Sequence, residues 1–367
     1  MKISIIGTRG IPNKYGGFEQ FAEFLSVGLQ NRGYEVTVYN AHFHPFKENN
    51  FKGVKIISKY SPENIIGSSA NFIYDYYSLR DSIKKGADIV LACGYQSTAI
   101  SFYLCSPQKT IIVTNMDGME WRRAKWNGVV KKLTKWFEKV AVKKSHYLVS
   151  DNIGIQQYFK KEYGVDSEFI PYGAEIIGTP EADTLKNYDL KQSEYYLLIA
   201  RLEPENNIEM ILDGYRAANH TEPLIVVGNN LHKYGTYLRE RYSTTPGIRF
   251  IGGIYKKDHL DTLRFYSKIY FHGHSVGGTN PSLLEAMAAS SFIAAHNNAF
   301  NLSVLGQEAV YFESSEDITK ILKQFDDHER KKAIFIEKNR SKILSLYSWE
   351  KIIGDYESFF NKIAKEK

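Results

Sequence analysis

The stretch GTRGIPNKYGGFEQF, Gly7 to Phe21, decides how this chain folds. Lys2 to Ile6 precedes it and reads as a short buried strand, while apolar residues recur at helical spacing from Phe18 onward. Four glycines lie between the strand and the helix. The sequence therefore predicts a strand, a glycine loop and a helix, which is the opening unit of an α/β domain.

The last two glycines of this loop, Gly16 and Gly17, stand where the helix begins. Glycine lets a ligand approach the main chain, and the N–H groups of a starting helix attract an anion. The spacing is not G-x-G-x-x-G, the second predicted strand ends at Asn40 rather than at an acid, and the Walker spacing is missing. A phosphate site without a nicotinamide cofactor is one interpretation. A tight turn that serves only packing is the other.

Composition limits the class of protein. A chain of 367 residues exceeds what one hydrophobic core usually supports, which favours two domains. The net charge of +6 does not by itself indicate nucleic acid, and two cysteines provide neither a metal-ligand set nor a disulfide framework. The chain enters a strand within three residues and has no apolar run of membrane-spanning length. We therefore expect a cytoplasmic protein, soluble or peripherally bound to a membrane.

Short β-rich runs alternate with helical patterns in both halves of the chain, and the pattern lapses between residues 167 and 194, which are therefore expected to be a linker. Such alternation predicts parallel sheets covered by helices. The fold class expected is α/β, with two doubly wound Rossmann-like domains facing a central cleft, where ligands bind outside the carboxyl ends of the strands. The predicted domains are residues 1–173 and 174–345, and a last helix, 346–367, is expected to pack back toward the first domain.

A second glycine loop, HGHSVGGTNPSLLEAMAAS, follows the predicted strand IYFH. Asn280 is a good helix cap and Pro281 a good first helical residue, so a helix is expected to begin beside Gly277 and Gly278. This is a second candidate anion site. Glu285, about one turn into that helix, is placed to accept hydrogen bonds from sugar hydroxyls. The alternative is a capped helix with a solvent-exposed glutamate.

Arg201, in ARLEPENNIE, follows the first strand of the second predicted domain. A guanidinium there can bind a diphosphate and stabilise its charge as it leaves. A surface ion pair with Glu203 or Glu205 is the alternative. No Asp-x-Asp pair is present, so no metal site is expected, and helix amino ends together with Arg201 would neutralise the leaving group.

The loop TNMDGMEWRRAKW provides two candidate catalytic carboxylates, Asp117 and Glu120. Asp117 is a plausible general base for an acceptor hydroxyl. It is equally plausible as the cap of the helix that follows.

That following segment, Trp121 to Ser145, is predicted to be one basic amphipathic helix. Such a helix suits an anionic membrane surface. A solvated face on a helix that packs on the sheet is the alternative, and nucleic acid is not expected because no nucleic-acid-binding module accompanies the patch. Its basic residues are Arg122, Arg123, Lys125, Lys131, Lys132, Lys135, Lys139, Lys143 and Lys144, and its apolar stripe is Trp126, Val129, Leu133, Trp136, Phe137 and Val140.

With these residues identified, the chain resembles the family 4 glycosyltransferases of the GT-B fold over nearly its whole length. The matching strings are YGGFE, IPYGA, ARLEPENN and GGTNPSLLEAMA. More narrowly, GTRGIPNKYGGFE, DGMEWRRAKW and HSVGGTNPSLLEAMA resemble the bacterial rhamnosyltransferases that build capsule and other surface polysaccharides.

The resemblance implies a nucleotide-sugar donor, with no separate cofactor, and mostly retention of anomeric configuration. For L-rhamnose the donor would be dTDP-β-L-rhamnose. Two departures from the wider family are Asn206, where a lysine is usual, and Gly277, where the first glutamate of a pair is usual. The resemblance assigns donor binding to Gly16, Gly17, Arg201, Gly277, Gly278, Thr279, Asn280, Ser282, Leu283 and Glu285.

The expected function is transfer of a deoxyhexose to a glycan hydroxyl on a lipid carrier, by an enzyme bound peripherally to the inner face of the cell membrane. A nucleotide-sugar 2-epimerase is the alternative within enzymes. A non-catalytic scaffold that binds membrane or polymer through the basic helix is the alternative from another class.

Overall fold

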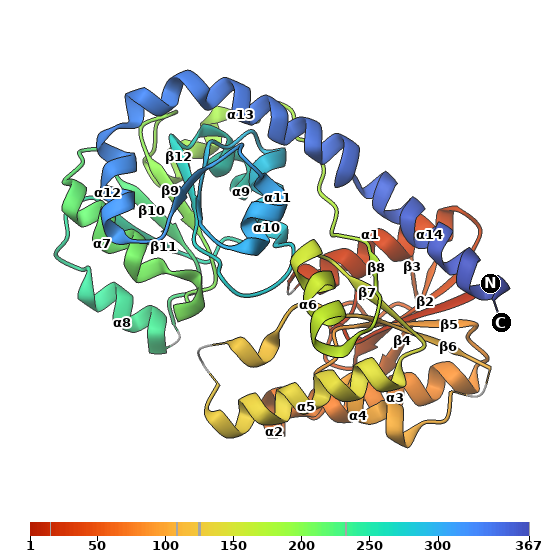
Figure 1. Ribbon diagram of the computed structural model, residues 1–367. Coiled ribbons are helices and arrows are strands. Elements are labelled where there is room, and N and C mark those ends of the chain that lie inside the picture. Colours follow the sequence, from red (N-terminus) through yellow and green to blue (C-terminus); the bar gives the residue numbers. More distant parts are fainter. Residues whose placement is uncertain (15, 108, 124–125, 232, 367) are drawn as a thin grey trace. The chain divides into compact units, whose positions relative to one another are not determined.

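The structure is a computed structural model that describes residues 1–14, 16–107, 109–123, 126–231 and 233–366, with residues 326–328 described for the backbone only. Contacts divide the chain into two compact units. Unit 1 comprises Met1–Arg122, Trp126–Tyr172 and Trp349–Lys367, and unit 2 comprises Arg123–Lys125 and Gly173–Ser348. Each unit is an α/β domain built on one sheet (Figure 1).

The sheet of unit 1 has the strand order β3-β4-β2-β1-β5-β6-β7-β8, and its pairs are parallel except β3 with β4. The strand order reverses between β1 and β5, so the loops that follow these two strands flank the switch point of the sheet. The strands are β1 (Lys2–Ile6), β2 (Glu35–Ala41), β3 (Asn50–Phe51), β4 (Val54–Lys59), β5 (Ile89–Cys93), β6 (Ile111–Asn115), β7 (Tyr147–Ser150) and β8 (Glu168–Phe169).

Helices cover both faces of this sheet (Figure 1). On one face α1 packs against α14, where the rings of Phe24 and Trp349 stack with centroids 4.4 Å apart. On the other face α3, α4 and α5 lie side by side. The helices are α1 (Gly17–Asn31), α2 (Glu63–Ile66), α3 (Ala70–Lys84), α4 (Thr98–Leu104), α5 (Gly128–Lys144), α6 (Ile153–Tyr163) and α14 (Trp349–Lys365), with 3-10 turns η1 (Gly67–Ser69) and η2 (Glu120–Arg122).

Unit 2 has a parallel sheet with the strand order β11-β10-β9-β12-β13-β14, which reverses between β9 and β12. This is the doubly wound order that the sequence predicts. The strands are β9 (Tyr196–Ile199), β10 (Leu224–Val227), β11 (Ile248–Gly252), β12 (Ile269–His272), β13 (Ile293–His296) and β14 (Val310–Phe312).

Helices pack around this second sheet, and its core contains the buried strands β9 and β10 together with the apolar faces of α7 and α12. The helices are α7 (Ile208–Ala218), α8 (Lys233–Arg241), α9 (Lys257–Tyr266), α10 (Pro281–Ala288), α11 (Ala299–Leu305), α12 (Ser315–Lys323) and α13 (Phe325–Leu346), with 3-10 turns η3 (Ala182–Tyr188) and η4 (Pro204–Asn206).

The stretch 167–194, which the sequence predicts to be a linker, is largely part of unit 2. Leu185 and Leu190 are buried there, and the Tyr266 hydroxyl donates to the carbonyl of Pro180 over 2.8 Å. The lapse in periodicity reflects a 3-10 turn and extended chain, which bury apolar residues without a helical or strand repeat.

The prediction of a single helix from Trp121 to Ser145 is wrong at its start, because α5 begins at Gly128. Asn127 is its cap: the backbone there is extended, and the side chain accepts a hydrogen bond from Val130 N over 3.0 Å. Of the predicted basic residues, Lys125 lies outside the described residues.

Candidate functional site

In unit 1, the side chain of Asn40 holds the backbone of the first glycine loop through hydrogen bonds. Asn40, at the end of β2, accepts from Ile11 N over 3.0 Å and donates to the carbonyl of Ile11 over 2.7 Å. Gly10 has a φ of +121°, and a Cβ there would lie 2.3 Å from the Asn40 side chain, so only glycine fits. The packing interpretation therefore accounts for this part of the loop.

The helix start in this loop already carries a negative charge. Gly16 caps α1, Gly17 is its first residue, and Glu19 in the first turn is buried. The Glu19 carboxylate accepts from Arg9 N over 2.9 Å, and Glu23 accepts from Asn13 N over 2.7 Å. Because Glu19 lies in the positive field of the helix start, a phosphate there would meet a like charge. The role of Gly16 and Gly17 in donor binding stays a prediction.

The loop after β6 carries both predicted catalytic carboxylates. Asp117 is partly exposed, and its negative charge adds to the burial that raises the pKa of the Cys93 thiol. Asp117 does not cap α5, because Asn127 does, so the capping alternative is wrong for that helix. Glu120 accepts a hydrogen bond from Gln96 Nε2 over 2.9 Å. The assignment of Asp117 and Glu120 as catalytic carboxylates stays a prediction.

Asp75, on α3, is a buried carboxylate of unit 1 that the sequence did not single out, and its exposed fraction is 1%. Burial raises its pKa to about 7, and a hydrogen bond with Ser97 opposes the shift. The folded state therefore binds a proton that the unfolded chain releases near pH 4, so stability falls as pH rises from about 4 to 7.

We predict that Asp75→Asn removes this pH-dependent loss of folding stability, which is on the order of 1 kcal/mol for each unit by which the pKa is raised. Melting temperatures from pH 5 to pH 8 should converge with wild type at the acidic end, and the variant should be the more stable at pH 8. Asp166→Asn, at an exposed ion pair with Lys160, is the matched control and should follow wild type. Parallel curves for wild type and Asp75→Asn would contradict the prediction.

In unit 2 the two loops at the switch point are tied together. Asn207 Nδ2 donates to the carbonyl of Gly273 over 2.8 Å, and Ser275 Oγ donates to the carbonyl of Glu205 over 2.7 Å. Side chains from α11 also hold the second loop, since Asn298 and Asn301 each donate an amide N–H to the carbonyl of His274 over 3.0 Å. The carboxyl ends of β9 and β12 therefore form one rigid surface.

Arg201 lies on this surface at the end of β9 and is exposed. In the part of the chain that the structure describes, its guanidinium makes no hydrogen bond or ion pair, so the ion pair with Glu203 or Glu205 is not formed. Asn206 Nδ2 donates to the carbonyl of Arg201 over 2.7 Å and fixes the backbone. Burial, followed by the charges of Arg201 and Arg123, lowers the pKa of His274 to about 3, which keeps this imidazole neutral.

Gly277 opens the loop after β12, with a φ of +127° and no atom of the described chain within 4 Å of a Cβ position. Gly278 and the buried Thr279 follow, and Asn280 caps α10 by accepting from Ser282 N over 2.9 Å. The empty space beside Gly277 suits a bulky group of a ligand.

The amides of the first turn of α10 are already engaged. The Ser282 N–H donates to the Asn280 side chain, Leu283 N donates to the carbonyl of Asn280 over 3.0 Å, and Pro281 has no N–H. The amides of Ser282 and Leu283 are therefore engaged within the helix start in this structure, and the assignment of these two residues to donor binding stays a prediction. A ligand there would have to displace the Asn280 cap or bind the preceding loop.

Glu285 is neither fully buried nor a free surface group. Its Oε2 pairs with Nη2 of the buried Arg264 over 2.6 Å, and its side chain is 21% exposed. The same guanidinium nitrogen lies 3.2 Å from Ser282 Oγ, which also contacts the Tyr270 hydroxyl at 2.8 Å. Arg264 thus orients Glu285 and Ser282 on α10. The sequence did not reveal this role because Arg264 lies on another helix, α9.

Two further groups of unit 2 were missed. Glu205 is buried, and neither carboxylate oxygen has a hydrogen-bond partner among the described residues. Arg123, which the sequence placed in the basic helix, groups with unit 2, and its Nη1 lies 3.9 Å from Glu205 Oε1. This ion pair could not be read from the sequence, because its two residues lie far apart in the chain.

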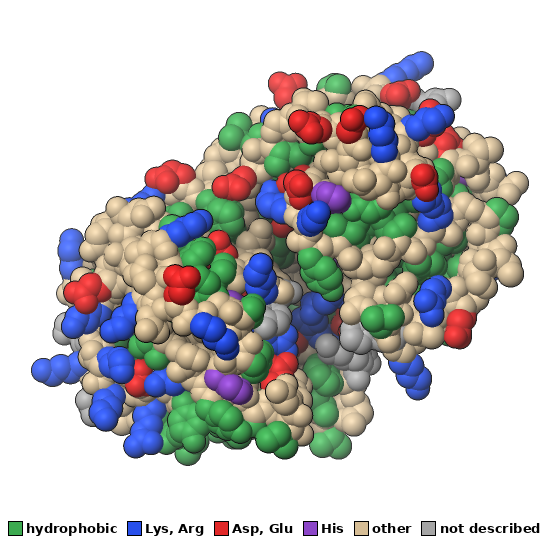
Figure 2. All heavy atoms as spheres, turned by 180° about the vertical axis from the view of Figure 1, so that it is seen from behind, with side chains coloured by type: hydrophobic (Ala, Val, Ile, Leu, Met, Phe, Trp, Pro, Cys, Tyr) green, Lys and Arg blue, Asp and Glu red, His purple; other side chains and the backbone are tan. Residues whose placement is uncertain are grey.

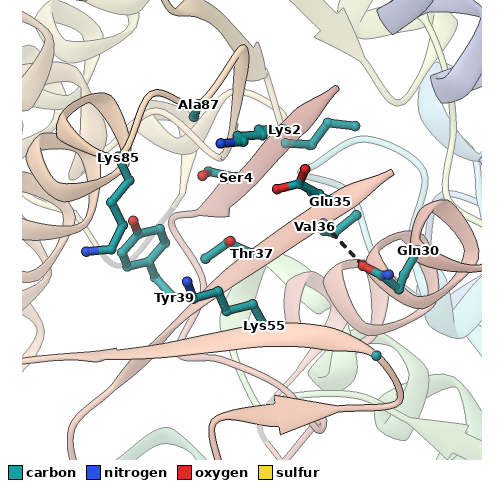
Figure 3. Close-up of a pocket in the computed structure, with 12 residues that line it drawn as sticks. Lys2, Ser4, Gln30, Glu35, Val36, Thr37, Tyr39, Lys55, Lys85 and Ala87 are labelled. Atoms are coloured by element: carbon teal, nitrogen blue, oxygen red, sulfur yellow. Dashed lines mark hydrogen bonds between the residues drawn. The ribbon is translucent and has the colours of Figure 1, made fainter. Parts of the chain in front are cut away.

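A cavity of about 400 Å³ lies elsewhere in unit 1, beside the first residues of β1, β2 and β4. Figure 3 shows Lys2, Lys55 and Lys85 around the hydroxyls of Ser4 and Thr37. These are the amino ends of the strands, whereas Asp117 and the glycine loop follow carboxyl ends. This cavity is therefore separate from the candidate site. In the described ranges no cluster of His, Cys, Asp and Glu has the makeup of a metal site.

Comparisons with known proteins agree with this architecture. Residues 1–175 match the family described as "Domain of unknown function (DUF1972)", and no match was found among curated protein sequences. Sucrose-phosphate synthase from Thermosynechococcus elongatus is similar in structure, with a TM-score of 0.83, 14% identity and 100% coverage of both chains.

Two other solved structures are similar over nearly the whole chain. HepE from Anabaena, in complex with UDP-glucose, has a TM-score of 0.76 and 12% identity, covering 99% of this chain and 100% of its own. A glycosyltransferase from Rickettsia africae has a TM-score of 0.73 and 12% identity, covering 100% and 99%. This chain therefore has the GT-B fold of two doubly wound α/β domains, as its sequence predicted.

Proposed function

We propose that this chain is a glycosyltransferase that moves a sugar from a nucleotide diphosphate to a hydroxyl group of a glycan. The observation that carries the proposal is the surface at the switch point of unit 2. There Arg201, whose guanidinium pairs with no side chain among the described residues, follows β9, and the open glycine loop at Gly277 follows β12. A doubly wound sheet binds its ligands at this place, and a guanidinium is suited to a diphosphate.

The proposed reaction uses one side chain as a general base and another to stabilise the leaving group. The acceptor oxygen forms a bond with the anomeric carbon on the face from which the diphosphate departs, as the bond between that carbon and the diphosphate oxygen breaks, so the configuration is retained. The hydroxyl proton passes to Asp117, and Arg201 stabilises the negative charge that develops on the leaving diphosphate. Glu285, with one oxygen held by Arg264, would accept hydrogen bonds from the ribose hydroxyls.

L-Rhamnose from dTDP-L-rhamnose is the donor that we propose, with retention of configuration and without a metal. The strings DGMEWRRAKW and HSVGGTNPSLLEAMA support it by resemblance. The site also differs from that of a glucose-type enzyme of the wider family, because Asn206 brings no charge and binds the Arg201 carbonyl, and Gly277 brings no carboxylate.

A thermal-shift panel of nucleoside diphosphates and nucleotide sugars tests the proposal, since a ligand that binds only the folded state raises its apparent stability. We expect dTDP and dTDP-L-rhamnose to raise the melting temperature, and dTDP to be released when a glycan acceptor is added. Conversion of the donor into another intact nucleotide sugar without acceptor would favour the 2-epimerase. No calorimetric binding of dTDP would favour the scaffold.

The acceptor that we propose is a glycan or lipid-linked oligosaccharide of capsule or other surface polysaccharide, met at the inner face of the cell membrane. Helix α5 supports this placement, because Phe137 and Val140 are buried while Val129, Leu133 and Trp136 are exposed. Exposed lysines lie beside that apolar face, among them Lys132, Lys139 and Lys143. Figure 2 shows that basic and hydrophobic side chains also lie next to one another on the surface seen from behind. In the described part of the chain, no helix is long and apolar enough to cross a bilayer.

We predict that Lys132→Ala with Lys139→Ala weakens binding to vesicles of phosphatidylglycerol and phosphatidylcholine by about 10- to 100-fold, at about 1 kcal/mol for each basic residue. Flotation of the protein with vesicles measures this. The matched control is Lys186→Ala with Lys191→Ala, two highly exposed lysines of unit 2, which should bind as wild type does. Equal losses in both variants would exclude α5 as the docking surface.

A further inference from the structure

Glu138, in the middle of α5, is a carboxylate with no solvent exposure. A buried carboxylate is costly unless charges and hydrogen bonds compensate it, and an apolar residue would pack the same helix face without that cost. Its two oxygens have separate groups of donors. Oε1 accepts from the hydroxyls of Tyr158 and Tyr163 on α6, each over 2.7 Å, and from Lys135 Nζ over 3.0 Å.

The other oxygen, Oε2, faces the loop that carries Asp117. Trp121 Nε1 donates to it over 3.1 Å, and the Tyr95 hydroxyl lies 3.3 Å away. The same hydroxyl lies 3.2 Å from the carbonyl of Gly118 and accepts from Glu120 N over 3.2 Å. The loop is therefore attached to this network at two points, Gly118, which has a φ of +84°, and Glu120.

The network also holds the indole ring of Trp121, which lies in the 3-10 turn after Asp117. The ammonium of Lys135 lies 4.8 Å from the centre of the Trp121 ring, and it pairs with Glu162 over 3.0 Å. Cation–π contacts of this kind stabilise one ring orientation. Trp121 is thus held by a hydrogen bond at its nitrogen and by a charge over its face.

We propose that Glu138 is a positioning residue for the transfer reaction, acting through Tyr95 and Trp121. It holds the turn at Gly118, and so holds the Asp117 carboxylate next to that turn in the place where it takes the acceptor proton. This inference rests on the proposed function. Displacement of a catalytic group by about 1 Å can lower the rate about 100-fold. A network that holds this loop in place therefore preserves the rate of transfer.

The two sides of the carboxylate allow a matched experiment. Tyr95→Phe and Tyr163→Phe each remove one hydroxyl bound to the same group, but only the first hydroxyl contacts the Asp117 loop. We expect Tyr95→Phe to lower kcat for dTDP release from dTDP-L-rhamnose, with lipid extract as the acceptor source, by about 10- to 100-fold. The donor KM should stay within about twofold, because the donor site that we propose lies in unit 2.

Tyr163→Phe should keep kcat within about twofold of wild type even where its melting temperature falls as far as that of Tyr95→Phe. The pH profile of kcat separates the two roles further. Its acidic limb should move in Tyr95→Phe, because the surroundings of the base change, and should stay in place in Tyr163→Phe. If Tyr95→Phe does not fold, Trp121→Phe, which removes the N–H donor to Oε2 together with part of the indole ring, takes its place.

Equal kcat losses in Tyr95→Phe and Tyr163→Phe, or a wild-type rate in Tyr95→Phe, would overturn the inference while leaving the proposed function standing. Failure of the proposed function looks different. In that case the wild-type protein itself would release no nucleoside diphosphate from any nucleotide sugar.

Discussion

Replacing Arg201 by alanine is expected to lower the rate of sugar transfer by about 100- to 1000-fold, the usual cost of removing one charged donor from a developing anion. The guanidinium is exposed and has no side-chain partner in the described residues, so its loss leaves nothing unpaired. The backbone of this loop is held by Asn206 instead. Stability should therefore change little. Steady-state kinetics and thermal unfolding of the same preparation measure both effects.

The control for this variant is Arg216→Ala, which removes an exposed arginine of α7 that pairs with Asp213. We expect it to transfer sugar at the wild-type rate. Near-normal transfer by Arg201→Ala would refute its assigned role, and a drop in melting temperature of the size seen for core variants would show that the arginine is structural.

The second large effect is expected for Asp117→Asn, which keeps the shape of the side chain and removes its ability to take a proton. Loss of a general base costs about 100- to 10,000-fold in kcat. The donor KM should be unchanged, because the donor contacts that we propose lie in unit 2. The acidic limb of the pH profile should also disappear. The rate of dTDP release in the presence of acceptor measures these changes.

Glu120→Gln provides the comparison, because Glu120 lies in the same loop and was the other candidate catalytic carboxylate. Its carboxylate already accepts a hydrogen bond from Gln96, and an amide oxygen can accept that bond as well. We expect a loss of less than about tenfold. A larger loss in Glu120→Gln than in Asp117→Asn would reverse the assignment of the base.

Much of the fold could be predicted because its buried strands are short apolar runs separated by loops. The predicted strand Lys2 to Ile6 has the bounds of β1, and Asn280 followed by Pro281 marks the start of α10. Helix α13, Phe325–Leu346, was missed because charged residues recur around it and leave no clear apolar face. The start of α5 was missed because basic and apolar residues continue across Asn127, where the chain leaves the helical conformation.

The candidate site could likewise be predicted only in part. Arg201 and the Gly277 loop follow strands directly, so the sequence could place them at strand ends. The contacts that shape them join residues far apart in the chain, such as Asn207 with Gly273 and Arg264 with Glu285. The spacing of residues along the sequence does not indicate which distant residues come into contact. Nothing in the sequence distinguishes Glu138 from an ordinary acid among basic residues, whereas its partners come from three other segments.

The most direct measurement of the central claim is a crystal structure of this chain with dTDP. The account predicts the diphosphate beside the loop at Gly277, within hydrogen-bond distance of the Arg201 guanidinium, with the ribose near Glu285. A nucleotide bound elsewhere, with Arg201 still facing solvent, would contradict it.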